Sequence, residues 1–111
     1  MSEDQLQATI FEWAWNTYPQ TRYCLWAVPN GGKRNIIEAQ KLKATGTLAG
    51  VHDLHFIWKG IFYTFELKVG SNKMSADQIK FKNAVEWQGG KCFEIRTFLE
   101  FVKIFENIIS L

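Results

Sequence analysis

Two acids and a lysine occupy parts of the sequence where charged side chains are least expected. Asp53 lies in the run "VHDLHFIW", and Glu66 and Lys68 lie in the run "IFYTFELKV". Both runs are rich in aromatic and β-branched residues, which is typical of strands with a buried face. Because side chains alternate along a strand, Glu66 and Lys68 point to the same side of theirs. The runs therefore predict polar chemistry on an otherwise apolar sheet.

The pair Lys59-Gly60 between the two runs predicts the two-residue turn of a β-hairpin. If these residues form the turn, Trp58 faces Ile61, and counting outward places Asp53 opposite Glu66. Cross-strand partners share one face, with their β-carbons about 5 Å apart. A three-residue loop would move Asp53 away from Glu66, so the prediction depends on this register.

Two carboxylates in one small volume repel each other unless a proton or a cation lies between them. Magnesium and manganese prefer carboxylate, carbonyl and water oxygens, so Asp53, Glu66 and the backbone carbonyl of Leu67 form a candidate ligand set. With Lys68 beside them, the group suits phosphodiester hydrolysis by a metal-activated water. The alternative is an edge strand with a solvated, ion-paired face, in which Asp53 only accepts backbone hydrogen bonds.

Four segments of the chain resemble the VRR-NUC nucleases, the virus-type replication-repair branch of the PD-(D/E)XK superfamily. They are "VPNGGKRN", "GVHDLHF", "FELKVGSNKMSADQ" and "GGKCFEIRT". The resemblance covers almost the whole chain and implies a restriction-endonuclease-like core. It implies that Asp53 and Glu66 bind the metal, that Lys68 is catalytic, and that Gln78 belongs to the site. Gln78 also fits a capping box with Ser75, and both interpretations stay open.

An N-terminal helix commonly adds one more acid to sites of the kind that the resemblance implies. On a helical wheel Glu3 falls near Leu6 and Ile10 on the apolar stripe, whereas Glu12 falls on the polar side. We therefore expect Glu3 to approach the site. The alternative for Glu3 is a first-turn acid that is stabilised by the helix dipole.

Basic residues in or beside the motifs are candidates for DNA contact. Lys33 and Arg34 follow a flexible Asn-Gly-Gly, and Lys73 lies in the loop after the Glu-x-Lys strand. Backbone amides and cations in such loops can hold phosphates. Scattered lysines are more often solubilising, and the net charge of +2 permits a nucleic-acid partner without requiring one.

Length and composition predict one folded domain over residues 1–111. The chain has 47% hydrophobic residues, which excludes disorder, and only two cysteines, Cys24 and Cys92, without metal-ligand spacing. The N-terminus lacks the features of a secretory signal, and no segment is long and apolar enough to span a bilayer. A soluble protein in a reduced, cytoplasmic environment, inside a bacterial or phage-infected cell, is expected.

The expected order of elements is αβαββαβα, a mixed sheet flanked by helices. Helices are expected from Ser2 to about Asn16, over "NIIEAQKLKAT", from Ser75 to about Trp87 and from Thr97 to the C-terminus. Strands are expected over "RYCLWAVP", the two hairpin runs and "KCFEIR". The last helix is apolar over much of its circumference, so we expect a second copy of the chain to cover it.

The sequence and the resemblance together predict a metal-dependent endonuclease for branched DNA, most simply a homodimeric Holliday-junction resolvase. A two-fold dimer would place two sites on one four-way junction. A flap nuclease or a less selective nuclease with the same site is an alternative. A DNA-binding module without activity is another, although it leaves the acids and the lysine without a purpose. A protein-interaction domain leaves them equally unexplained.

Overall fold

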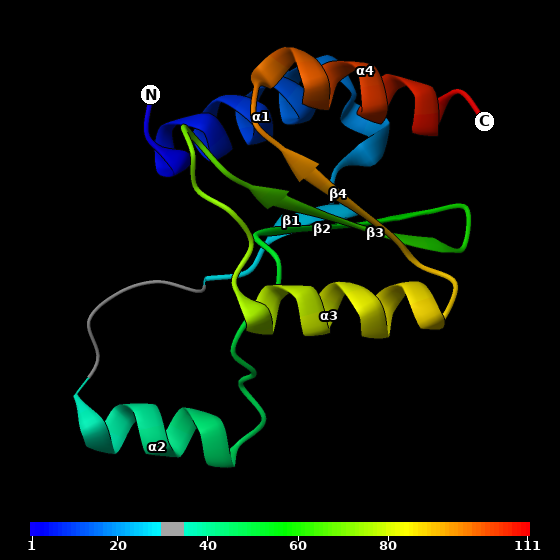
Figure 1. Ribbon diagram of the computed structural model, residues 1–111. Coiled ribbons are helices and arrows are strands. Elements are labelled where there is room, and N and C mark those ends of the chain that lie inside the picture. Colours follow the sequence, from blue (N-terminus) through cyan, green and yellow to red (C-terminus); the bar gives the residue numbers. More distant parts are fainter. Residues whose placement is uncertain (30–34) are drawn as a thin grey trace.

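The apolar runs of the sequence form four strands that pair into one sheet in the order β1-β2-β3-β4 (Figure 1). The computed structural model describes residues 1–29 and 35–111. The strands are β1 (Leu25–Ala27), β2 (Leu54–Trp58), β3 (Ile61–Leu67) and β4 (Lys91–Ile95). The first three are antiparallel neighbours, and β3 and β4 run parallel. The predicted mixed sheet is confirmed.

Helices occur at each of the places where the sequence predicts them. They are α1 (Glu3–Thr17), α2 (Ile36–Ala44), α3 (Ala76–Trp87) and α4 (Phe98–Ile109), and a short 3-10 helix, Pro19–Thr21, follows α1. Capping boxes begin α1, α3 and α4, because a Ser or Thr side chain and the third helical residue exchange hydrogen bonds with each other's backbone. The predicted αβαββαβα order is confirmed, with the 3-10 helix as an addition.

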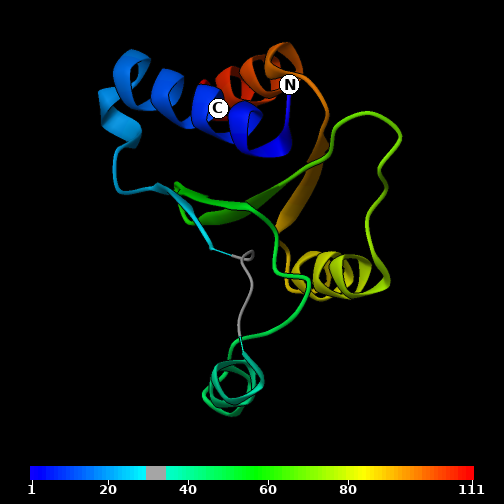
Figure 2. The same ribbon diagram turned by 90° about the vertical axis from the view of Figure 1, so that its left-hand side faces the viewer.

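Helices cover both faces of the sheet. Figures 1 and 2 show α1 and α4 packed side by side on one face, α3 on the other face, and α2 standing away from the sheet. The core lies between the sheet and the α1–α4 pair, where alternate residues of β2 and β3 point toward these helices. Its largest fully buried side chains include Phe56, Phe65, Phe101 and Phe105. The opposite face, toward α3, carries Glu66 and Lys68.

The hairpin register is the feature that fixes the polar face. Lys59 and Gly60 have φ values of 49° and 81°, as a two-residue type I′ turn requires. Trp58 pairs with Ile61, and the ladder continues to the pair of Leu54 with Phe65. The predicted turn and register of the hairpin are confirmed. The next residues beyond the ladder are Asp53 and Glu66, so they lie opposite each other.

The apolar stripe of α4 is covered within the chain itself. Phe101, Phe105 and Ile108 are buried against the sheet and α1, and the rings of Phe105 and Phe56 lie 4.8 Å apart. The expectation that a second copy must cover this stripe is therefore wrong in its reasoning, because α1 and the sheet already do so. Among the described helices, none is long and apolar enough to cross a bilayer.

Candidate active site

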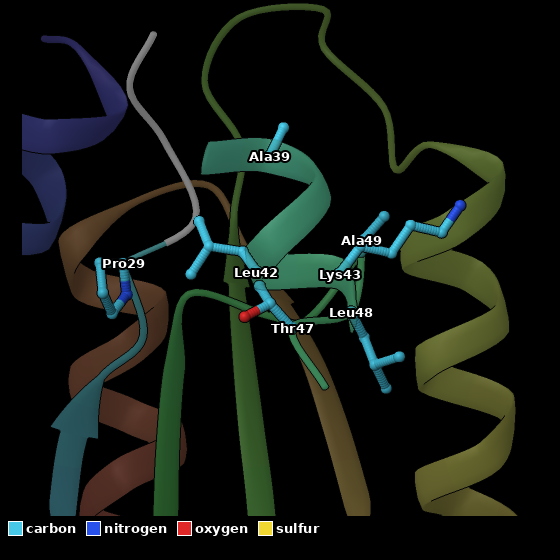
Figure 3. A pocket seen from close by; sticks show the side chains of 8 residues that line it. Pro29, Ala39, Leu42, Lys43, Thr47, Leu48 and Ala49 are labelled. Atoms are coloured by element: carbon cyan, nitrogen blue, oxygen red, sulfur yellow. The ribbon is translucent and has the colours of Figure 1, made fainter. Parts of the chain in front are cut away.

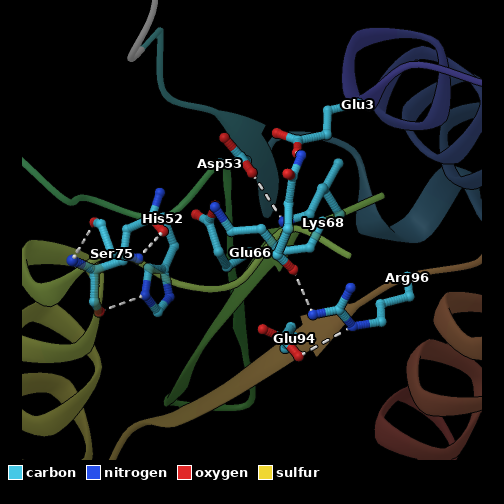
Figure 4. A network of polar contacts seen from close by, with 11 residues as sticks. Glu3, His52, Asp53, Glu66, Lys68, Ser75, Glu94 and Arg96 are labelled. Atoms are coloured by element: carbon cyan, nitrogen blue, oxygen red, sulfur yellow. Dashed lines mark hydrogen bonds and ion pairs between the residues drawn. The ribbon is translucent and has the colours of Figure 1, made fainter. Parts of the chain in front are cut away.

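The acid pair and the lysine converge where β2 and β3 leave their ladder (Figure 4). Asp53 Oδ2 accepts a hydrogen bond of 2.8 Å from the backbone N–H of Leu67, so the carboxylate continues the pairing of the strands. Lys68 Nζ lies 3.5 Å from Glu66 Oε2. The three side chains thus form one polar group on the face of the sheet that α3 covers.

Glu66 is the most deeply buried member of the group, with 1% of its surface exposed. Burial, followed by the charge of Asp53, raises the pKa of Glu66 to about 8 despite the opposing effect of Lys68. Burial also raises the pKa of Asp53, and the hydrogen bond from the Leu67 N–H opposes this rise. At neutral pH this raised pKa keeps Glu66 mainly protonated in the absence of a cation.

Unsatisfied oxygen atoms at the pair fit a hard divalent cation. Glu66 Oε1 is buried and has no hydrogen-bond partner among the described residues. In a strand, the carbonyl of a residue points to the same side as its N–H, so the Leu67 carbonyl points toward Asp53. The described chain offers no cluster of three or more acidic, His or Cys side chains that could hold a metal. Two carboxylates and one carbonyl suit magnesium or manganese, which keep several water ligands.

A second polar network links α1 to this site. Asn72 Nδ2 donates to Glu3 Oε2 over 3.3 Å, and the charge of Glu3 contributes to the raised pKa of Asp53. Glu3 is partly buried, whereas Glu12 is exposed on α1. The structure therefore brings Glu3, and not Glu12, to the acid pair, in agreement with the preference from the helical wheel. The role of Glu3 in catalysis stays a prediction.

Arg96 holds the loop after Lys68 in place, and the sequence did not reveal this role. Its guanidinium donates to the carbonyl oxygens of Gly70 and Asn72 over 3.0 and 2.6 Å and pairs with Glu94 at 3.3 Å (Figure 4). The parallel register of β3 and β4, which pairs Leu67 with Ile95, places Arg96 beside the loop. That parallel pairing was the missing signal, because the order of the strands in the sheet was not predicted.

Gln78 sits in the first turn of α3, and its side-chain oxygen accepts from the backbone N–H of Ser75 over 2.9 Å. The capping interpretation describes this contact. The side-chain nitrogen of Gln78 has no hydrogen-bond partner among the described residues. A place for Gln78 in the site stays a prediction.

His52 and His55 are packed against the rings of α3 and the sheet. His52 is fully buried, and burial lowers the pKa of both imidazoles. His55 stacks on Phe81 with ring centroids 5.7 Å apart.

The predicted DNA-contacting residues are only partly placed. Lys33 and Arg34 lie outside the described residues. Lys73 is exposed in the loop that Arg96 holds, downstream of Lys68. The role of Lys73 in DNA contact stays a prediction.

A hollow of about 530 Å³ lies apart from the acids, between α2 and the chain that leads to β2. Its walls are mainly apolar and include Leu42, Leu48 and Ala49 (Figure 3). Lys43 is the charged residue in its lining. Since no acidic side chain of the described residues lines this hollow, the candidate site is the acid pair.

An α/β fold with a buried acid pair and lysine on a mixed sheet is the architecture that the resemblance implied. A solved structure described as a VRR_NUC domain protein has this fold. Its TM-score is 0.75, and the match covers 99% of this chain and 89% of that chain at 17% sequence identity. Neither a known family model nor a curated protein matches this sequence. At this identity the likeness shows the fold alone, so the VRR-NUC fold is confirmed.

Proposed function

We propose that the chain is a magnesium- or manganese-dependent endonuclease that hydrolyses phosphodiester bonds in branched DNA, with the Holliday junction as its main substrate. The observation that carries the proposal is the convergence of Asp53, Glu66 and Lys68, with a buried oxygen of Glu66 that has no partner in the described part of the chain. The fold shared with a protein described as a VRR_NUC domain protein supports the nuclease class.

Each residue of the site has its own role in the proposed hydrolysis. Asp53, Glu66 and the carbonyl of Leu67 would hold the ion. When bound, the ion polarises a phosphoryl oxygen and lowers the pKa of a water molecule. Lys68, held near Glu66, orients the attacking water and offsets negative charge that develops on the phosphate. Glu3 and Gln78 complete the site, and Lys73, with Lys33 and Arg34, contacts the DNA backbone.

A homodimer is part of the proposal because a four-way junction has two-fold symmetry. Two copies related by a two-fold axis would present two acid pairs to one junction. Exposed apolar side chains on the described surface include Leu99 of α4 and Ile36 and Ile37 of α2, with 68%, 75% and 77% of their surface exposed. They are the first positions to test for contact between copies.

Cleavage of labelled DNA tests the proposed activity. Wild type, Lys68→Ala and Lys103→Ala would be incubated with a four-way junction, a flap and a linear duplex in magnesium or manganese. Lys103 is exposed on α4, so its variant controls for loss of a lysine as such. We expect wild type and Lys103→Ala to make paired cuts in the junction. We expect the cleavage rate of Lys68→Ala to be at least about a hundredfold lower.

Other outcomes separate the alternatives. Preferred cutting of the flap, or equal cutting of all three substrates, would replace the junction by another substrate of the same site. Binding without cuts in either ion would contradict the nuclease and leave a DNA-binding module. Light scattering during size-exclusion chromatography tests the dimer, and a stable monomer both free and on the junction would contradict it.

A further inference from the structure

His52 has hydrogen-bond partners for both ring nitrogens and is completely buried. Nδ1 lies 2.8 Å from the hydroxyl oxygen of Thr64, and Nε2 lies 3.0 Å from the carbonyl oxygen of Gln78. A carbonyl oxygen only accepts, so Nε2 carries the proton and Nδ1 accepts from the Thr64 hydroxyl. The ring also packs edge-on against Phe81, with centroids 4.8 Å apart. Burial, packing and bonding thus fix one orientation of this side chain.

The two hydrogen bonds of His52 join the segments that surround the acid pair. Thr64 precedes Glu66 by two residues and lies on the same face of β3. Gln78 belongs to the first turn of α3, which covers that face, and His52 directly precedes Asp53. One imidazole therefore connects the strand that carries Glu66, the covering helix and the backbone of Asp53 (Figure 4).

Gly50 lets this segment lie directly on α3. A β-carbon at Gly50 would stand 2.3 Å from the backbone carbonyl carbon of Asp77, which is closer than atoms can approach. The backbone of Gly50 therefore touches the first turn of α3, two residues before His52. The close approach and the His52 hydrogen bonds act on the same short stretch.

Asp53 needs such support because it lies beyond the last pair of the hairpin ladder, Leu54 with Phe65. Its backbone is bonded to the residue that follows β1, since its carbonyl oxygen accepts from the N–H of Val28 over 2.9 Å. Its carboxylate must stay within hydrogen-bond distance of the Leu67 amide, to which it is bonded over 2.8 Å. A fixed residue immediately before Asp53 limits the movement of this carboxylate.

We infer that His52 is a positioning residue, which holds the Asp53 carboxylate against the Leu67 amide and next to Glu66 through its bonds to Thr64 and Gln78. Its relevance to catalysis rests on the proposed nuclease function, while the positioning itself does not. Residues that support metal ligands in this way typically change metal affinity by 10- to 100-fold when they are replaced.

Hydrogen exchange of two neighbouring amides tests the inference in the full chain without metal. The Leu67 N–H bonds to the Asp53 carboxylate, whereas the Lys68 N–H bonds to the carbonyl of Ile95. In His52→Phe, which keeps a ring but loses both hydrogen bonds, we expect the Leu67 amide to exchange at least about tenfold faster relative to the Lys68 amide, measured in chelator. A merely structural role would accelerate both amides by the same factor and overturn the inference.

Two conservative variants test the Thr64 and Gln78 contacts one at a time. They also replace His52→Phe in the experiment if that variant does not fold. His52→Gln can still donate to the Gln78 carbonyl, and His52→Asn can still accept from Thr64. We expect each variant to raise the ratio of Leu67 to Lys68 exchange above that of wild type, but by less than Asp53→Ala does. A wild-type ratio in both variants would overturn the inference.

Manganese titration of the same variants links the inference to the site. We expect the dissociation constant of His52→Phe to be about tenfold higher than that of wild type. If wild type does not bind manganese, the proposed function fails, and the exchange ratio still tests the positioning. If wild type and His52→Phe bind manganese equally, the proposed function stands and the positioning role is overturned.

Discussion

At the scale of single residues, the burial of Glu66 decides the chemistry of the site. Glu66 is only 1% exposed and lies beside a second acid. Its pKa is therefore raised from the ordinary value of 4.5 to about 8. A cation that binds the ionised pair must displace this proton, so ion binding and protonation compete. The same burial that makes the acid costly in the free protein would prepare it as a ligand of the proposed ion.

The raised pKa of Glu66 makes the stability of the metal-free protein depend on pH. The folded chain holds the Glu66 proton more tightly than the unfolded chain does. The stability that this proton contributes is complete below pH 4.5 and is lost as the pH rises toward about 8. The neutral imidazoles of His52 and His55 act in the opposite direction, chiefly below 6.5. Between about pH 7 and pH 8 we therefore expect the Tm in chelator to fall with rising pH.

Thermal melting of wild type and Glu66→Gln in chelator measures this effect. The amide of the variant does not titrate, so its Tm should change less over the same interval. Equal slopes for the two proteins would show that Glu66 is ionised throughout and would contradict the raised pKa.

Gln78 offers a second prediction at this scale, because its capping oxygen and its side-chain nitrogen are separable. Gln78→Glu keeps an oxygen for the Ser75 N–H and removes the amide nitrogen. If Gln78 belongs to the site, cleavage should fall while stability stays within about 0.5 kcal/mol of wild type. Urea denaturation and single-turnover cleavage check the two parts, and unchanged cleavage would assign Gln78 to the cap alone.

At the scale of elements, the contact between Gly50 and α3 sets the position of the chain that leads to Asp53. Gly50 has a φ of +86° and no room for a β-carbon, while Gly46 has a φ of +104° and open space around it. Both substitutions to Ala strain the backbone, but only Gly50→Ala also displaces α3. We expect Gly50→Ala to cost at least about 2 kcal/mol more in unfolding free energy than Gly46→Ala.

Urea denaturation with matched variants at Gly50 and Gly46 provides the measurement. Equal losses of unfolding free energy in the two variants would mean that a small shift of α3 accommodates the added β-carbon, and that the contact with Asp77 does not hold α3 in place. The result also bears on the acid pair, because the displaced segment contains His52 and Asp53.

Local patterns were sufficient to predict most elements and the hairpin. The turn at Lys59-Gly60 fixed the register, and the register fixed which acids meet. Contacts between distant segments were not accessible in the same way. The Arg96 contacts depend on the parallel pairing of β3 and β4, and the His52 bonds depend on where α3 lies on the sheet. Neither arrangement leaves a periodic pattern in the sequence, because both are set by packing.

At the scale of the whole molecule, α4 stabilises the fold from the side opposite the acids. Phe105 is fully buried and contacts the rings of Trp13, Tyr18, Phe56 and Phe101, whereas Leu99 of the same helix is 68% exposed. The composition of the helix suggested a surface for a second copy, and its packing shows a core element. Composition could not distinguish these two uses of an apolar stripe.

This packing predicts a large difference between two truncations on α4. Phe105→Ala should lower the free energy of unfolding by about 3 to 5 kcal/mol, while Leu99→Ala should change it by less than about 0.5 kcal/mol. Denaturation at several protein concentrations checks both values. A loss for Leu99→Ala that grows with protein concentration and shrinks on dilution would show that this position lies in a dimer interface.

We propose that Asp53 and Glu66 together hold a divalent ion. Thermal melting of wild type, Asp53→Asn and Asp4→Asn with increasing manganese tests it most directly, because an ion that binds the native state raises the Tm. Asp4 is an exposed acid of α1 and controls for loss of one negative charge. We predict that manganese raises the Tm of wild type and Asp4→Asn and leaves Asp53→Asn nearly unchanged. An equal rise in all three proteins, or no rise in wild type, would contradict ion binding by the acid pair.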